Sequence, residues 1–131
     1  MTAMGMYAHV RGWLEIDFKQ RVVAERIIEQ NHHELYSGGW AFPSRPFNWS
    51  LYLFYGGDIR QHEVSWLRGQ VEQLARMSPV DEDNDWPRGL FVVTADEHDG
   101  ARTWQIHDAV LTELPAPDLS WLSEARADPG R

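Results

Sequence analysis

Residues 7–16 alternate apolar and polar side chains without a break, and this alternation constrains the fold more than any other feature. Successive side chains of a strand point to opposite faces, so the segment predicts a strand that is buried on one face only. The buried face would carry Ala8, Val10, Gly12, Leu14 and Ile16, and the other face Tyr7, His9, Arg11, Trp13 and Glu15.

A helix is expected directly after this strand. Asp17 and Gln20 have the spacing of a capping box, in which two side chains bond to the free N–H groups of a helix start. We therefore predict a helix over residues 18–31, with Val22, Val23 and Ile27 as its apolar stripe.

The rest of the chain predicts four more strands and one more helix. Apolar runs predict strands at residues 40–42, 48–55, 90–94 and from 103 to 110 or beyond. The run at 48–55 is apolar at nearly every position, which is typical of a central strand, and Gly56-Gly57 should end it. A helix is expected over residues 60–77, with its apolar stripe formed by Val64, Leu67, Val71 and Leu74.

This order of elements predicts an α+β fold. Two split βαβ units would give a ferredoxin-like βαββαβ antiparallel sheet with two helices on one face. The last strand, reached through a hairpin loop at residues 96–100, would be an additional C-terminal edge strand. We expect one domain over residues 1–131, with a core at about 7–114 and a surface wrap at 115–131.

Composition excludes several classes of protein. The chain has 131 residues, is 43% hydrophobic and carries a formal net charge of −8, which opposes nonspecific binding to nucleic acid. It contains no cysteine, so disulfides and thiolate chemistry are excluded. No apolar run reaches the roughly 20 residues of a membrane span, and the first residues lack the features of a signal peptide. We therefore expect a cytoplasmic protein.

The evidence for catalysis is weak. The paired glycines Gly38-Gly39 and Gly56-Gly57 are not followed by the Lys and Ser or Thr of a phosphate-binding loop. The adjacent residues His32 and His33 would diverge on a helix and could not easily share one ion. We expect a protein that is not an enzyme and that needs no metal or cofactor.

The features that favour binding are aromatic and acidic side chains. Arg11 and Trp13, together with Tyr52, would lie on the sheet face away from the helices, and such residues are enriched at interface hot spots. Two loops are acidic, and their candidate partner-binding residues are Asp81, Glu82, Asp83, Asp85, Asp96 and Glu97. These charges are either a solvated rim or a docking surface for a basic protein.

Other interpretations of the aromatic face remain open. The C-terminal wrap or a second copy of the chain would also account for exposed aromatic residues. An RNA-recognition module uses a similar aromatic sheet, but the acidic loops oppose it.

Two stretches resemble small bacterial immunity proteins of polymorphic and contact-dependent toxin systems. The first is Met6-Tyr7-Ala8-His9-Val10-Arg11-Gly12-Trp13, which is similar to their opening strand. Their closing hairpin is matched by Gly89-Leu90-Phe91-Val92-Val93, Asp96-Glu97, Trp104-Gln105-Ile106 and Leu111-Thr112-Glu113. The resemblance implies a non-enzymatic inhibitor that binds the toxin domain encoded beside it, and many such toxins are nucleases with basic clefts. The alternative is a dimeric accessory or regulatory domain that self-associates through the aromatic face.

Overall fold

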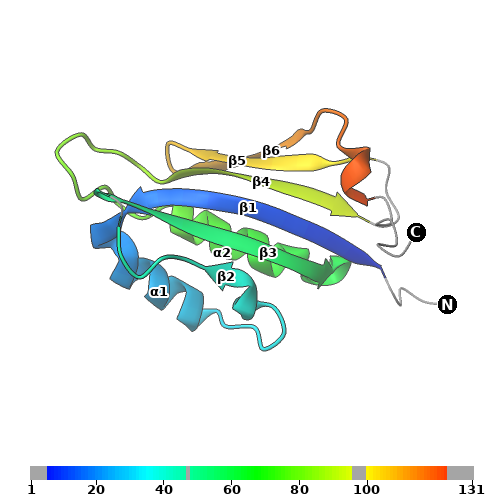
Figure 1. The fold of residues 1–131 in the computed structure, drawn as a ribbon, viewed down its shortest axis with the longest axis horizontal. Coiled ribbons are helices and arrows are strands. Elements are labelled where there is room, and N and C mark those ends of the chain that lie inside the picture. The colour runs from blue at the N-terminus through cyan, green and yellow to red at the C-terminus, as the bar shows by residue number, and fades with distance from the viewer. Residues whose placement is uncertain (1–5, 47, 96–99, 124–131) are drawn as a thin grey trace, which may run out of the picture.

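One antiparallel sheet of six strands organises the computed structural model, which describes residues 6–46, 48–95 and 100–123 (Figure 1). The strand order is β2-β3-β1-β4-β5-β6. The strands are β1 (Tyr7–Asp17), β2 (Trp40–Ala41), β3 (Ser50–Arg60), β4 (Arg88–Ala95), β5 (Arg102–His107) and β6 (Val110–Pro115). The helices are α1 (Arg21–Gln30) and α2 (Val64–Ala75). The α+β class and the antiparallel sheet are therefore confirmed.

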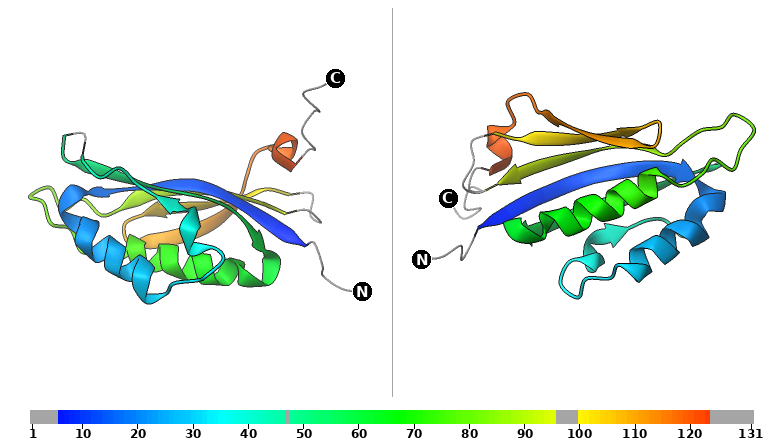
Figure 2. Two further views of the ribbon diagram at one scale, coloured as in Figure 1. Left: turned by 60° about the horizontal axis from the view of Figure 1, so that its bottom comes forward. Right: turned by 180° about the vertical axis from the view of Figure 1, so that it is seen from behind.

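Both helices lie on one face of the sheet, which we call the inner face; the opposite one is the outer face (Figure 2). The alternation of β1 is as predicted, because Ala8, Val10, Leu14 and Ile16 are buried on the inner face. Leu67, Val71 and Leu74 of α2 are fully buried against the sheet, as the sequence also predicts. One hydrophobic core therefore lies between the sheet and the helices.

α1 begins at Arg21, three residues later than predicted, although the capping box at Asp17 is confirmed. The Asp17 carboxylate accepts a hydrogen bond from the Lys19 N–H at 2.8 Å, and the Gln20 side chain accepts one from the Asp17 N–H at 3.0 Å. The predicted apolar stripe is correct only in part: Ile27 packs against the core, but Val22 and Val23 are exposed. The chain first forms a 3₁₀ turn (Phe18–Gln20) in which Gln20 is buried. The side-chain amide of Gln20 donates a hydrogen bond to the Ser78 carbonyl at 2.9 Å. The positions that face the core then follow in helical steps from Gln20 and Ala24, which are buried, to Ile27 and Ile28, which are partly buried.

The paired glycines do not end β3, contrary to the prediction. β3 continues through Gly56-Gly57 to Arg60, because its whole length pairs with β1 in a register from Tyr7↔Arg60 to Asp17↔Ser50. Glycine adopts extended backbone readily, so the partner strand decides the outcome. α2 consequently starts later than predicted, after a 3₁₀ turn at Gln61–Glu63.

β3 is also not a central strand that is covered on both faces. It is second from the edge of the sheet, and only two of its residues pair with β2. Leu51, Leu53 and Tyr55 are buried, whereas Tyr52 and Phe54 are exposed on the outer face. The apolar run therefore combines one core face with one exposed aromatic face.

The C-terminal end forms two strands where one edge strand was predicted. Asp108 and Ala109 both have positive φ angles, of 50° and 67°, and make the turn between β5 and β6. Glu113 ties this hairpin to α2: it accepts from Arg68 Nη1 at 2.8 Å and from Arg102 Nε at 2.6 Å. Beyond β6 the chain forms a short 3₁₀ helix (Ser120–Ser123) on the outer-face side of the sheet (Figure 2).

Candidate protein-binding surface

A row of exposed apolar side chains crosses the outer face. It consists of the rings of Trp13, Tyr52 and Phe54 together with Leu90, and we call it the aromatic row after its three rings. The register places Trp13 directly between Phe54 of β3 and Leu90 of β4. The ring centroids of Trp13 and Tyr52 are 5.9 Å apart, and those of Tyr52 and Phe54 are 6.2 Å apart and stacked. Tyr52 is 40% exposed and Phe54 is 48% exposed, so these rings meet water over much of their surface.

The C-terminal 3₁₀ helix covers the other end of the outer face. It contacts β4, and the Arg11 guanidinium donates to the Leu122 carbonyl at 3.4 Å. Thr94 and Thr103 are buried in this region although both project from the outer face. The described part of the predicted C-terminal wrap, residues 116–123, therefore covers the end of the face near Arg11 and leaves the aromatic row exposed.

The first acidic loop lies at the opposite end of the sheet from that cover, where β1 ends and β4 begins (Figure 1). Asp81, Asp83 and Asp85 each place a carboxylate oxygen within 4.8 Å of the others. The loop is closed by the Asp85 N–H, which donates to Asp81 Oδ1 at 3.0 Å, and by Asn84 in the left-handed region at φ 56°. Three carboxylates at this spacing are the ligand type that divalent cations take, but exposed acidic groups are often this close without an ion.

The acidic loop raises the pKa of Asp85 above its ordinary value. Partial removal of water from its carboxylate is the largest cause, and the negative charges of Asp81 and Asp83 follow. Arg88 opposes this shift but is engaged elsewhere: it donates through Nε to Glu15 Oε1 at 3.2 Å. That contact is also the main reason why the pKa of Arg88 is raised.

The pair formed by Glu15 and Arg88 joins the acidic loop to the aromatic row. Glu15 lies directly opposite Tyr52 on one side and Arg88 on the other. Glu15 and Arg88 also line a surface depression together with Trp49, Asp81, Asp85 and Trp86. The structure thus connects Asp81 and Asp85, through Glu15 and Arg88, to Tyr52 of the aromatic row, and the sequence alone does not predict this connection.

The other candidate residues are placed differently. Glu82 is exposed beside the acidic cluster, and Arg11 lies at the covered end of the outer face. Asp96 and Glu97 lie outside the described residues.

Sequence reasoning missed Trp49 and Trp86 as surface residues. Trp49 was assigned to an apolar strand, but β3 begins one residue later and Trp49 is 70% exposed. Trp86 follows the acidic run directly, and a large aromatic residue within a polar loop is a signal that would have identified it.

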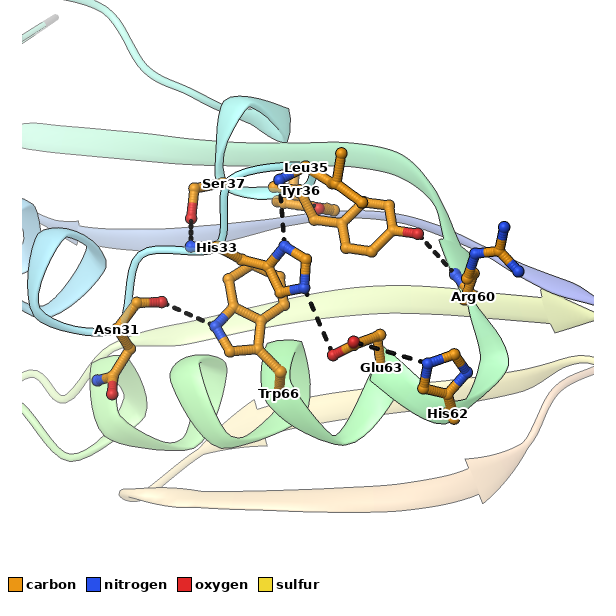
Figure 3. A network of polar contacts seen from close by, with 10 residues as sticks. Asn31, His33, Leu35, Tyr36, Ser37, Arg60, His62, Glu63 and Trp66 are labelled. Atoms are coloured by element: carbon orange, nitrogen blue, oxygen red, sulfur yellow. Dashed lines mark hydrogen bonds and ion pairs between the residues drawn. The ribbon is translucent and has the colours of Figure 1, made fainter.

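His33 has a structural role far from this surface (Figure 3). Its ring lies between those of Tyr36 and Trp66, with centroid distances of 4.7 and 5.1 Å. Nδ1 accepts a hydrogen bond from the Leu35 N–H at 3.1 Å, and Nε2 faces Glu63 Oε2 at 3.4 Å. Since both ring nitrogens have partners, His33 ties the loop after α1 to the start of α2.

Comparisons with protein-family models, with curated proteins and with solved structures gave no match. In the part of the chain that the structure describes, neither helix has the length and apolar character needed to cross a membrane.

Proposed function

We propose that the protein is a non-catalytic inhibitor that binds a basic toxin domain, as the resemblance to bacterial immunity proteins implies. The observation that supports this proposal is the continuity of the aromatic row with the acidic loop, through Glu15 and Arg88. Aromatic residues in the centre of a contact supply most of its binding energy, and opposite charges around them accelerate association and select the partner.

The charge of this surface favours a basic protein over a nucleic acid. Asp81, Asp83 and Asp85 repel one another, and a cationic partner would relieve that repulsion. Phosphates would increase it. We accordingly propose that the protein binds no nucleic acid and no membrane, needs no cofactor, and acts in the cytoplasm on a toxin that is a nuclease.

Co-expression with the product of the neighbouring gene tests this proposal. We expect the toxin domain to arrest growth when it is expressed alone, and this protein to restore growth and to co-purify with it. A variant with Trp13→Ala and Tyr52→Ala should restore growth less well, whereas Val22→Ala on the exposed face of α1 serves as the control. Growth arrest that this protein does not relieve, with no co-purification, would contradict the proposal.

A dimeric accessory domain is the alternative function, and the same exposed rings favour it. Two copies could bury their aromatic rows against each other. Sedimentation of the protein alone distinguishes the two: the inhibitor should be a monomer whose Trp13→Ala variant has the same mass, whereas the dimer should dissociate in that variant.

We also infer that β1 to β4 with the two helices form a ferredoxin-like unit, to which β5 and β6 are added as a hairpin. The support for this is that β1 lies between β3 and β4, with β2 outside β3 and all neighbours antiparallel.

A further inference from the structure

Two exposed indoles stand beside the acidic loop, at the edge of the aromatic row. Trp49 and Trp86 both line the depression described above, which has a cavity volume of about 70 Å³. Trp49 and Asp85 also line a wider, adjoining depression. Trp40 and Trp104 are buried in the core, whereas Trp49 and Trp86 are exposed and line the same depression.

The charges around these indoles are unbalanced. Five carboxylates line the two depressions, against two cationic side chains, Lys19 and Arg88. Arg88 is already bound to Glu15, so the carboxylates of the loop outnumber the cationic side chains beside them. The negative charges of Asp81 and Asp83 raise the pKa of Asp85, and one cation bound beside these carboxylates would lower it.

We propose that this depression is a receptor for one guanidinium group, the head of an arginine side chain that projects from the partner protein. Trp49 and Trp86 supply flat aromatic faces for stacking and cation–π contact. The carboxylates of Asp81 and Asp85 supply the acceptors for its N–H groups. This inference rests on the proposed function only for the identity of the partner protein, because binding of a free arginine derivative can be measured without that partner.

The shape and chemistry of the site select arginine over other cations. Guanidinium is planar, is more weakly hydrated than an ammonium group and can stack on an indole while it bonds to carboxylates. A compact ammonium would use the charge but not the stacking.

The test uses the full chain and N-acetyl-arginine amide as the probe. Proton–nitrogen correlation spectra report each indole N–H separately, and the Trp49→Phe and Trp86→Phe variants assign two of the signals. We expect the probe to shift the signals of Trp49 and Trp86 in a saturable way at constant ionic strength. Trp121, which is 62% exposed in the C-terminal 3₁₀ helix at the other end of the sheet, should not shift and is the matched control.

Two further probes give the specificity. N-acetyl-citrulline amide has nearly the same shape without the charge and should produce no saturable shift, and N-acetyl-lysine amide should bind more weakly than the arginine probe. Asp81→Asn should weaken binding of the arginine probe by about two- to fivefold, as expected for an exposed ion pair. Thermal unfolding of each variant confirms that it is folded.

Several results would overturn the inference: equal shifts with citrulline, equal affinity for lysine, equal shifts at Trp121, or no shift at Trp49 and Trp86. These results are independent of the proposed function. If the toxin co-purifies but the arginine probe does not bind, the receptor inference is wrong and the inhibitor proposal is kept. If the arginine probe binds saturably but no toxin co-purifies, the inhibitor proposal is wrong and the receptor inference is kept.

Discussion

Asp85 lies in surroundings that favour the protonated form of its carboxyl. Loss of hydration and the charges of Asp81 and Asp83 raise its pKa, so the folded state loses stability as the pH rises through the range in which this carboxyl ionises. Residues that serve binding often reduce stability in this way, because the charges that attract a partner repel one another in its absence.

Replacement of Asp85 by asparagine should therefore separate stability from binding. We expect Asp85→Asn to unfold at the same temperature as the natural protein or slightly higher, and to associate more slowly with a basic partner. Differential scanning calorimetry and stopped-flow association measure the two effects. Glu29→Gln, which removes an exposed charge on α1, is the control and should change neither; a clear loss of stability in Asp85→Asn would contradict the electrostatic account.

Gly12 is required by a close approach between β1 and β4. A Cβ atom added there would overlap the ring of Phe91 and approach the Leu90 carbonyl oxygen at 2.5 Å. Backbone atoms and a fully buried ring cannot move easily, so the overlap must distort the sheet.

We expect Gly12→Ala to lower the free energy of unfolding by about 1–3 kcal/mol, which is the usual effect of overpacking a core. Gly56→Ala is the matched control, because it also lies in a paired strand but has no atoms within 4 Å of the added Cβ. Urea denaturation of both variants measures the difference. Equal stability of Gly12→Ala and Gly56→Ala would show that β1 and β4 do not approach each other closely at Gly12.

At the scale of elements, Tyr55 connects β3 to the loop that precedes β2. Its hydroxyl donates to the Tyr36 carbonyl at 2.6 Å, and its ring packs edge-on against Trp40 with a centroid distance of 5.1 Å. Burial, with a smaller contribution from Tyr36, raises the pKa of Tyr55 to about 12.

This shift predicts a loss of stability at alkaline pH. Above pH 10 the unfolded chain releases the Tyr55 proton, whereas the folded protein keeps it until about pH 12. The unfolded state is therefore favoured increasingly across that range, by at most about 2.7 kcal/mol, the equivalent of two pKa units. Denaturant titrations between pH 9 and 12 should show a steeper decline for the natural protein than for Tyr55→Phe. Tyr52→Phe, which removes an exposed hydroxyl, should keep the full decline; the same decline in all three proteins would refute this role of Tyr55.

The elements also show where local sequence signals succeed. The capping box at Asp17 and Gln20 and the stripe of α2 were predictable because each depends on residues within a few positions of one another. The path of β3 through Gly56-Gly57 was not, because it depends on pairing with Tyr7 to Arg11, more than forty positions away. The apolar run alone predicted a strand covered on both faces, and only the structure shows that Phe54 is exposed beside Tyr52.

At the scale of the whole molecule, the net charge of −8 and the position of the acidic loop predict how fast a basic partner is captured. Reversal of the loop charges, with Asp81, Glu82, Asp83 and Asp85 changed to lysine, should slow association much more than it changes thermal stability. Added salt should slow the natural protein towards the rate of this variant.

Stopped-flow association with the toxin domain, at several salt concentrations, measures this effect. A protein whose association is indifferent to both salt and the charge reversal would not act through its acidic loop. Substitution of Tyr52 by alanine in the same assay should instead accelerate dissociation, because its ring would be buried in the contact.

The sequence by itself determined which face of β1 is buried, that a capping box at Asp17 precedes α1, how α2 contacts the sheet and that the chain is acidic. Each of these follows from the order of neighbouring residues or from composition, and needs no knowledge of the rest of the chain. Only the tertiary structure decided that Trp49 and Trp86 meet the acidic loop beside the aromatic row, and that the C-terminal segment covers the other end of the outer face. The physical reason is that strand register and the packing of loops arise from contacts between distant segments, whose pairing a local pattern does not specify.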